Sequence, residues 1–110
     1  MEKAVKYWAI EEGYETIYDD NAFCTYEYSD GEFYISNFYV EDRTHGRSRA
    51  FFNHVKEKAL ELGADRITGN LHMNTANKEN YSNKVMIHLR NGYKILSVHE
   101  NRITVIYELN

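Results

Sequence analysis

One stretch in the middle of the sequence constrains the fold more than any other. An extended run, an amphipathic helical run and a second extended run follow one another. The first run, Glu32–Val40, is rich in the aromatic and β-branched residues that favour strands. The helical run has an apolar stripe that consists of Phe51, Val55, Ala59 and Leu62. The second extended run is Arg66–Leu71. Two strands joined through a helix are expected to lie parallel, with a right-handed crossover.

Hairpins are predicted on both sides of this crossover. Tyr14–Tyr18 and Ala22–Ser29 read as strands, and Asp30-Gly31 predicts a tight turn into the central strand. A second helix is predicted at roughly Tyr81–Asn91, with Val85, Met86 and Leu89 turned inward. The last expected hairpin joins Tyr93–Val98 to Arg102–Leu109. The opening segment, Glu2–Glu12, fits a helix or a strand.

Both faces of the central strand carry bulky residues, so we expect it to be covered on both sides. Simple alternation would place Phe33, Ile35 and Asn37 on one face and Tyr34, Ser36 and Phe38 on the other. The expected fold class is α/β (α+β): one domain over residues 1–110, with a mixed, largely antiparallel sheet of about six to seven strands. That sheet should have a central parallel pair and helices on both of its faces.

Composition excludes several classes of protein. A chain of 110 residues with 43% hydrophobic and 15% aromatic residues is long and apolar enough to build a core, which argues against disorder. Its single Cys rules out a disulfide framework, and the spacing of His72, His88 and His99 predicts no metal site. A pI near 5.7 argues against nucleic-acid binding. With no signal peptide or membrane span visible, a cytoplasmic location is expected.

The connection after the central strand places three arginines, Arg43, Arg47 and Arg49, at the start of a helix. Because a helix N-terminus carries about half a positive charge, arginines are unfavourable there unless an anion binds between them. Gly46 would let the backbone approach a phosphate closely. The alternative is a solvated helix end whose arginines cover neighbouring apolar surface.

This connection resembles the pyrophosphate loop of the GNAT superfamily of acetyl-CoA-dependent N-acetyltransferases, written Q/R-x-x-G-x-G/A. The matching residues are Arg43-Thr44-His45-Gly46-Arg47-Ser48, with Ser in place of the final Gly or Ala. A second match, Asn91-Gly92-Tyr93-Lys94-Ile95, is similar to the Gly-Phe or Gly-Tyr pair that closes the family's next helix. The resemblance covers residues from about 32 to 97.

The resemblance implies that acetyl-CoA is the co-substrate and that the acceptor is an amine, on a small molecule, a protein lysine or a protein N-terminus. It implies that the central strand pairs with pantetheine while Arg66–Leu71 splays away from it. The implied CoA-binding residues are Phe38, Tyr39, Val40, Arg43, Thr44, His45, Gly46, Arg47, Ser48 and, from the asparagine-rich loop, Asn77.

The resemblance also suggests catalytic residues. His88 stands four residues before the closing Gly, where the family often has a Tyr that acts on the leaving thiol, so His88 is expected to take that role. Tyr81 and Tyr93 are the alternatives in another register, and the other interpretation of His88 is a packed helix residue. The family's usual strand Glu is missing and Glu32 is remote, which leaves His72 as the candidate base, or as an ordinary loop histidine.

Two further interpretations stay open. The chain could be an inactive GNAT-shaped protein that binds acyl-CoA or a partner protein, or an unrelated small interaction domain. Its short region before the central strand, rich in Tyr and Phe, predicts a homodimer. The abundance of Asn and Tyr and the lack of Pro suggest a bacterial or phage genome.

Overall fold

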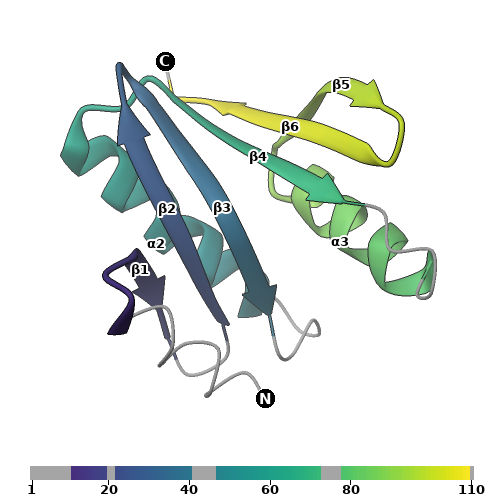
Figure 1. The fold of residues 1–110 in the computed structure, drawn as a ribbon, viewed down its shortest axis with the longest axis horizontal. Helices are drawn as coiled ribbons and strands as arrows, with labels where there is room; N and C mark the ends of the chain where they lie inside the picture. Colours follow the sequence, from purple (N-terminus) through teal and green to yellow (C-terminus); the bar gives the residue numbers. More distant parts are fainter. Residues whose placement is uncertain (1–10, 20–21, 41–46, 73–77, 110) are drawn as a thin grey trace.

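The structure, a computed structural model, describes residues 11–19, 22–40, 47–72 and 78–109. These residues form a six-stranded sheet with strand order β1-β2-β3-β4-β6-β5 and two helices (Figure 1). The elements, in chain order, are β1 (Glu15–Tyr18), β2 (Ala22–Ser29), β3 (Glu32–Val40), α2 (Arg47–Leu62), β4 (Arg66–His72), α3 (Lys78–Arg90), β5 (Lys94–His99) and β6 (Arg102–Glu108).

The first three strands form an antiparallel meander, as predicted. The turn between β2 and β3 has positive φ at both central residues, 51° at Asp30 and 82° at Gly31. A two-residue turn of this kind matches the right-handed twist of the flanking strands, and Gly adopts it without steric cost. The Asp-Gly pair therefore fixes where the central strand begins.

The predicted crossover is present. β3 and β4 pair in parallel and are connected through α2, which ends at Leu62 and is followed by Gly63 with φ 88°. β6 then lies between β4 and β5 and is antiparallel to both, so the sheet is mixed and largely antiparallel, as expected. Neither of the two helices that the structure describes is long and apolar enough to cross a membrane.

The core lies between the sheet and the two helices. Phe51, Val55 and Ala59 of α2 are fully buried, as the apolar stripe predicted. The fourth residue of that stripe, Leu62, is the last residue of the helix and is 37% exposed, so the prediction is wrong there. On α3 the inward residues are Ile87 and His88. Two of the three residues expected to point inward, Met86 and Leu89, are 42% and 37% exposed, so that part of the prediction is wrong. The apolar residues of α3 are nearly consecutive in the sequence, between positions 85 and 89. They therefore lie around the helix and do not define one face.

The helices α2 and α3 pack beside each other, with the rings of Phe52 and His88 5.1 Å apart. Phe38 of β3 contacts both rings, which places the two helices on the same side of the sheet. The expectation of helices on both faces stays a prediction, because residues 1–10 lie outside the described part of the chain.

A β-bulge interrupts β3. Thr25 pairs with Asn37 and Tyr26 pairs with Ile35, so Ser36 is an extra residue. The Ser36 hydroxyl and the Asn37 amide both hydrogen-bond to Thr25 Oγ1, at 2.6 and 2.9 Å, and therefore point the same way. Beyond Ile35, the prediction of which side chains of β3 share a face is wrong. The extra residue exchanges the two faces and so turns Phe38 toward the helices.

Candidate active site

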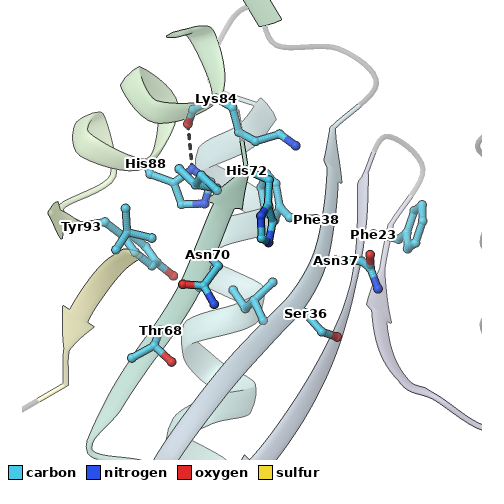
Figure 2. Close-up of a pocket in the computed structure, with 14 residues that line it drawn as sticks. Phe23, Ser36, Asn37, Phe38, Thr68, Asn70, His72, Lys84, His88 and Tyr93 are labelled. Carbon is cyan, nitrogen blue, oxygen red and sulfur yellow. Dashed lines mark hydrogen bonds between the residues drawn. The ribbon is translucent and has the colours of Figure 1, made fainter. Parts of the chain in front are cut away.

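The two parallel strands separate halfway along their length. Their register runs from Glu32↔Arg66 to Ile35↔Gly69, and then β3 continues to Val40 while β4 continues to His72. A cavity of about 370 Å³ opens where they part (Figure 2). Its wall consists of the diverging strand ends together with residues from β2, α3 and β6 and with Tyr93, which directly precedes β5. Ligands of α/β sheets commonly bind at such a carboxyl-end opening.

Three of the residues predicted from the sequence line this one cavity: Phe38, His72 and His88. Tyr39 and Val40 continue β3, where they pair with Phe23 and Ala22 of β2. Among the described residues, the other edge of β3 has no β4 partner after Ile35, so its backbone faces the opening. This matches the expectation that the end of the strand is free to pair with a ligand.

The predicted pyrophosphate loop lies mostly outside the described residues, as do Arg43, Thr44, His45, Gly46 and Asn77. Arg47 and Ser48 are the first two residues of α2, which begins at the end of the sheet where β3 finishes (Figure 1). The first turn of α2 contains no acidic residue. That turn therefore leaves the positive end of a sixteen-residue helix uncompensated by its own side chains.

His88 is 2% exposed and packs among Phe38, Phe52 and Tyr93. Burial lowers the pKa of its imidazole to about 4, so the ring is neutral at neutral pH. Its Nδ1 lies 2.8 Å from the carbonyl oxygen of Lys84 (Figure 2). Because a carbonyl only accepts, the ring hydrogen is on Nδ1, and Nε2 presents a lone pair.

His72 occupies the rim of the same cavity. It is exposed, at the carboxyl end of β4, where it pairs with Arg102 of β6. Phe38 and Lys84 line the same cavity (Figure 2). The structure thus brings together the two histidines singled out in the sequence, one buried and one accessible.

Tyr93 is a cavity residue that the sequence suggested only as an alternative to His88. It directly precedes β5 and is 4% exposed, and its hydroxyl is buried without a hydrogen-bond partner among the described residues. Burial raises the pKa of this phenol well above its ordinary value, so it stays protonated. The sequence signal was the Gly-Tyr pair, which marks the end of the helix but says nothing about the hydroxyl.

The other side of the opening carries a ladder of polar bonds that the sequence did not predict. Thr68 donates to Glu32 at 2.9 Å, and Asn70 donates to the Tyr34 hydroxyl at 3.1 Å. Thr104 in turn donates to Asn70 at 2.7 Å. Glu32 is therefore hydrogen-bonded at the start of the parallel strand pair, at the end opposite the opening. This agrees with the expectation that it lies far from the reacting groups.

No family model matches the sequence, and no curated protein matches it either. Solved structures match most of the chain. A protein assigned to the GNAT acetyltransferase family from Desulfovibrio desulfuricans is 17% identical with a TM-score of 0.70, over 99% of this chain and 76% of that one. The Campylobacter jejuni N-acetyltransferase PseH, solved with acetyl coenzyme A, is 9% identical with a TM-score of 0.66. The match covers 99% of this chain and 79% of that one.

The anti-CRISPR protein AcrVA5 is closer in size. It is 16% identical with a TM-score of 0.65, and the match covers 84% of this chain and 97% of that chain. Identities this low establish the fold, which agrees with the one that the loop and the Gly-Tyr pair suggested. The mixed sheet, the α2 crossover and the opening between β3 and β4 are those of a protein with the GNAT fold.

Proposed function

We propose that this protein is an acetyl-CoA-dependent N-acetyltransferase. The observation that carries the proposal is the cavity at the point where β3 and β4 stop pairing. It lies in a GNAT fold, and one protein of similar structure has been solved with acetyl coenzyme A and another with coenzyme A. The histidines at positions 72 and 88 line that cavity, which supports a site for chemistry as well as for binding.

The chain offers groups suited to an extended ligand that ends in a pyrophosphate. The free backbone edge of β3 after Ile35 could pair with the pantetheine amides as an added strand would. The residues 43–48 and the N-terminus of α2 would hold the pyrophosphate with backbone N–H groups and guanidinium charge. Asn77 is proposed as a further contact. Phe38 supplies apolar surface along the same path.

In the proposed reaction the acceptor amine attacks the thioester carbonyl carbon. The new C–N bond forms, the C–S bond breaks with its electron pair on sulfur, and the amine nitrogen loses a proton. His72, at the accessible rim, is proposed to take that proton, and His88 is proposed to position the reacting end through Nε2. Proximity between amine and thioester supplies much of the remaining rate in such a site.

A second candidate function is binding of acyl-CoA, or of a partner protein, without acetyl transfer. Two observations favour it: the central strand has no carboxylate between Tyr34 and Phe38, and the ring proton of His88 is held by the Lys84 carbonyl. For an active enzyme, the acceptor is an amine on a small molecule, a protein lysine or a protein N-terminus.

The experiment incubates the protein with labelled acetyl-CoA and a panel of polyamines, aminoglycosides, peptides and proteins, and measures labelled product together with released thiol. Calorimetry with CoA runs in parallel. Transfer above the uncatalysed rate supports the proposal. Binding without transfer to any acceptor favours the second candidate, and no binding of CoA or acetyl-CoA overturns both.

A further inference from the structure

The cavity wall contains a nucleophile of the same chemical class as the proposed acceptor. Within the part of the wall that the structure describes, Lys84 supplies the one primary amine. It lies on α3 one turn before His88, and residues four apart on a helix share a face. Both side chains line the opening between the separating strands (Figure 2). The lysine amine and the proposed acetyl donor therefore share one cavity.

The turn of α3 that carries Lys84 is held in place at the wall. The Lys84 carbonyl oxygen lies 2.8 Å from Nδ1 of His88 and accepts the ring hydrogen. The His88 ring is itself packed between Phe38 and Tyr93 and is 2% exposed. The backbone of Lys84 is thus fixed, while the flexible four-carbon stem lets the amine move within the opening.

Electrostatics place the Lys84 amine near the His88 ring. Burial is the main reason that the pKa of His88 falls to about 4, and the positive charge of Lys84 lowers it further. Such an effect weakens with distance and is screened by water. The amine therefore lies near the end of the cavity where the proposed function places the thioester.

Proximity favours the reaction of an amine in this position. An ordinary lysine amine, with a pKa of about 10.4, is neutral in about one molecule in a thousand at pH 7.4, and only the neutral form attacks a thioester. Groups held in the right geometry within one site react as though one of them were present at about 10⁵ M or more. That advantage exceeds the loss to protonation, so an amine in the wall can accept an acetyl group when no acceptor is bound.

We propose that Lys84 is a site of self-acetylation: when acetyl-CoA occupies the cavity and no acceptor does, the Lys84 amine takes the acetyl group. The inference rests on the proposed function and adds a modification of the protein itself. The bond from Nζ to the acetyl carbonyl carbon forms, and the C–S bond breaks with its electron pair on sulfur. The nitrogen gives its proton to His72 or to water. The products are an acetylated Lys84 and CoA.

Acetylation changes the site in a way that limits the reaction. It converts the ammonium group into a neutral amide, which is no longer a nucleophile, and it adds bulk inside a cavity of about 370 Å³. A second acetyl-CoA then meets no primary amine in the described wall. The transfer therefore stops at one acetyl group at this site.

The test incubates the purified protein with acetyl-CoA that carries a deuterated acetyl group, without any added amine. Intact mass spectrometry follows the number of labelled groups, and peptide mapping locates them. Lys84 should be labelled at least about a hundredfold faster than Lys94, an exposed lysine of β5 that reports the uncatalysed reaction. The rate constant should not depend on protein concentration, because the transfer occurs within one chain.

Two variants sharpen the assignment. Lys84→Arg keeps the positive charge and removes the nucleophilic amine, because a guanidinium group stays protonated, so the fast labelling should be absent. The matched control, Lys94→Arg, should keep it. Melting temperatures show whether each variant is folded, and the peptide map of the wild type decides the outcome even if Lys84→Arg is not.

Labelling of Lys84 no faster than that of Lys94, or a rate constant that grows with protein concentration, would overturn the inference. So would binding of acetyl-CoA by calorimetry, with or without transfer to an added amine, in a protein whose Lys84 stays unlabelled. If the wild type does not bind acetyl-CoA, the proposed function fails and the inference fails with it. Calorimetry therefore distinguishes the two failures.

Discussion

At the residue scale, His88 is a buried residue whose side chain can ionise. Its pKa is about 4 in the folded chain against an ordinary value of 6.5. Between these values the unfolded chain binds more protons than the folded one, so the free energy of unfolding falls as pH drops through this window. We expect a loss on the order of 3 kcal/mol between about pH 6.5 and about pH 4 from this group.

Urea unfolding at a series of pH values measures this loss. In His88→Gln the slope across the window should flatten, since Gln does not titrate. The matched control is His54→Gln, which removes an exposed imidazole from α2 and should keep the wild-type slope. An unchanged slope in His88→Gln would show that other groups cause the acid sensitivity.

The contribution of His88 to turnover can be measured separately from its contribution to stability. If His88 positions or acts on the thiol, His88→Ala should slow single turnover by about 10²–10⁴-fold while CoA still binds. His88→Tyr should restore part of the rate, because a phenol can also serve a thiolate. Melting temperature and single-turnover rate are measured on the same samples.

His72→Ala is the comparison for this experiment, because its ring is exposed at the cavity rim and contributes little packing. It should lower turnover without lowering the melting temperature. A normal rate together with a lowered melting temperature in His88→Ala would identify His88 as a packed helix residue only.

The sequence identified some site residues and missed others for a physical reason. His72 and His88 could be singled out because a motif spacing and a strand end are local features. The unpartnered state of Tyr93 and the engagement of Asn70 depend on which strands meet across the sheet. Pairing between β4 and β6 brings together residues far apart in the chain, which no local pattern reports.

At the element scale, Gly69 is the last residue of β4 that pairs with β3, and it lies where the cavity begins. A Cβ there would meet Ile35 and Val105 at 3.7 to 3.8 Å, which is ordinary contact. Gly69→Ala should therefore fold normally and bind CoA as the wild type does. Gly69→Leu extends into the opening and should weaken CoA binding by about tenfold or more.

Calorimetry with CoA and thermal melting of both variants check this prediction. The idea that the ligand occupies the opening would be refuted by a Gly69→Leu protein that is folded and binds CoA with wild-type affinity. Gly69→Ala is the control for the loss of glycine itself.

The positions of strands β2 and β3 were predictable, whereas the inward face of α3 was not. The bounds of β2 and β3 agree with the sequence prediction because Asp30-Gly31 separates two β-rich runs. The bulge escaped prediction because Ser36-Asn37 differs little from an ordinary polar pair in a strand. That one extra residue decides that Phe38 faces the helices and the cavity.

At the scale of the whole molecule, we expect a homodimer. The edge strand β5 is exposed along its length, with Leu96 and Val98 at 59% and 66% exposure. Light scattering should give about twice the 13.0 kDa of the chain. The double variant Leu96→Lys with Val98→Lys should lower that mass toward the monomer, and the control Glu57→Ala, at an exposed position of α2, should not. A wild-type mass of one chain at high concentration would contradict the expectation.

The short parallel seam between β3 and β4 has a dynamic consequence. Among the described residues, only four register pairs join the β1-β2-β3 half of the sheet to the β4-β6-β5 half, helped by the Glu32–Thr68 and Tyr34–Asn70 bonds. The two halves should therefore open as separate cooperative units. A ligand bridging the strand ends would fasten them together, so CoA should slow amide hydrogen exchange in β4 as well as in β3.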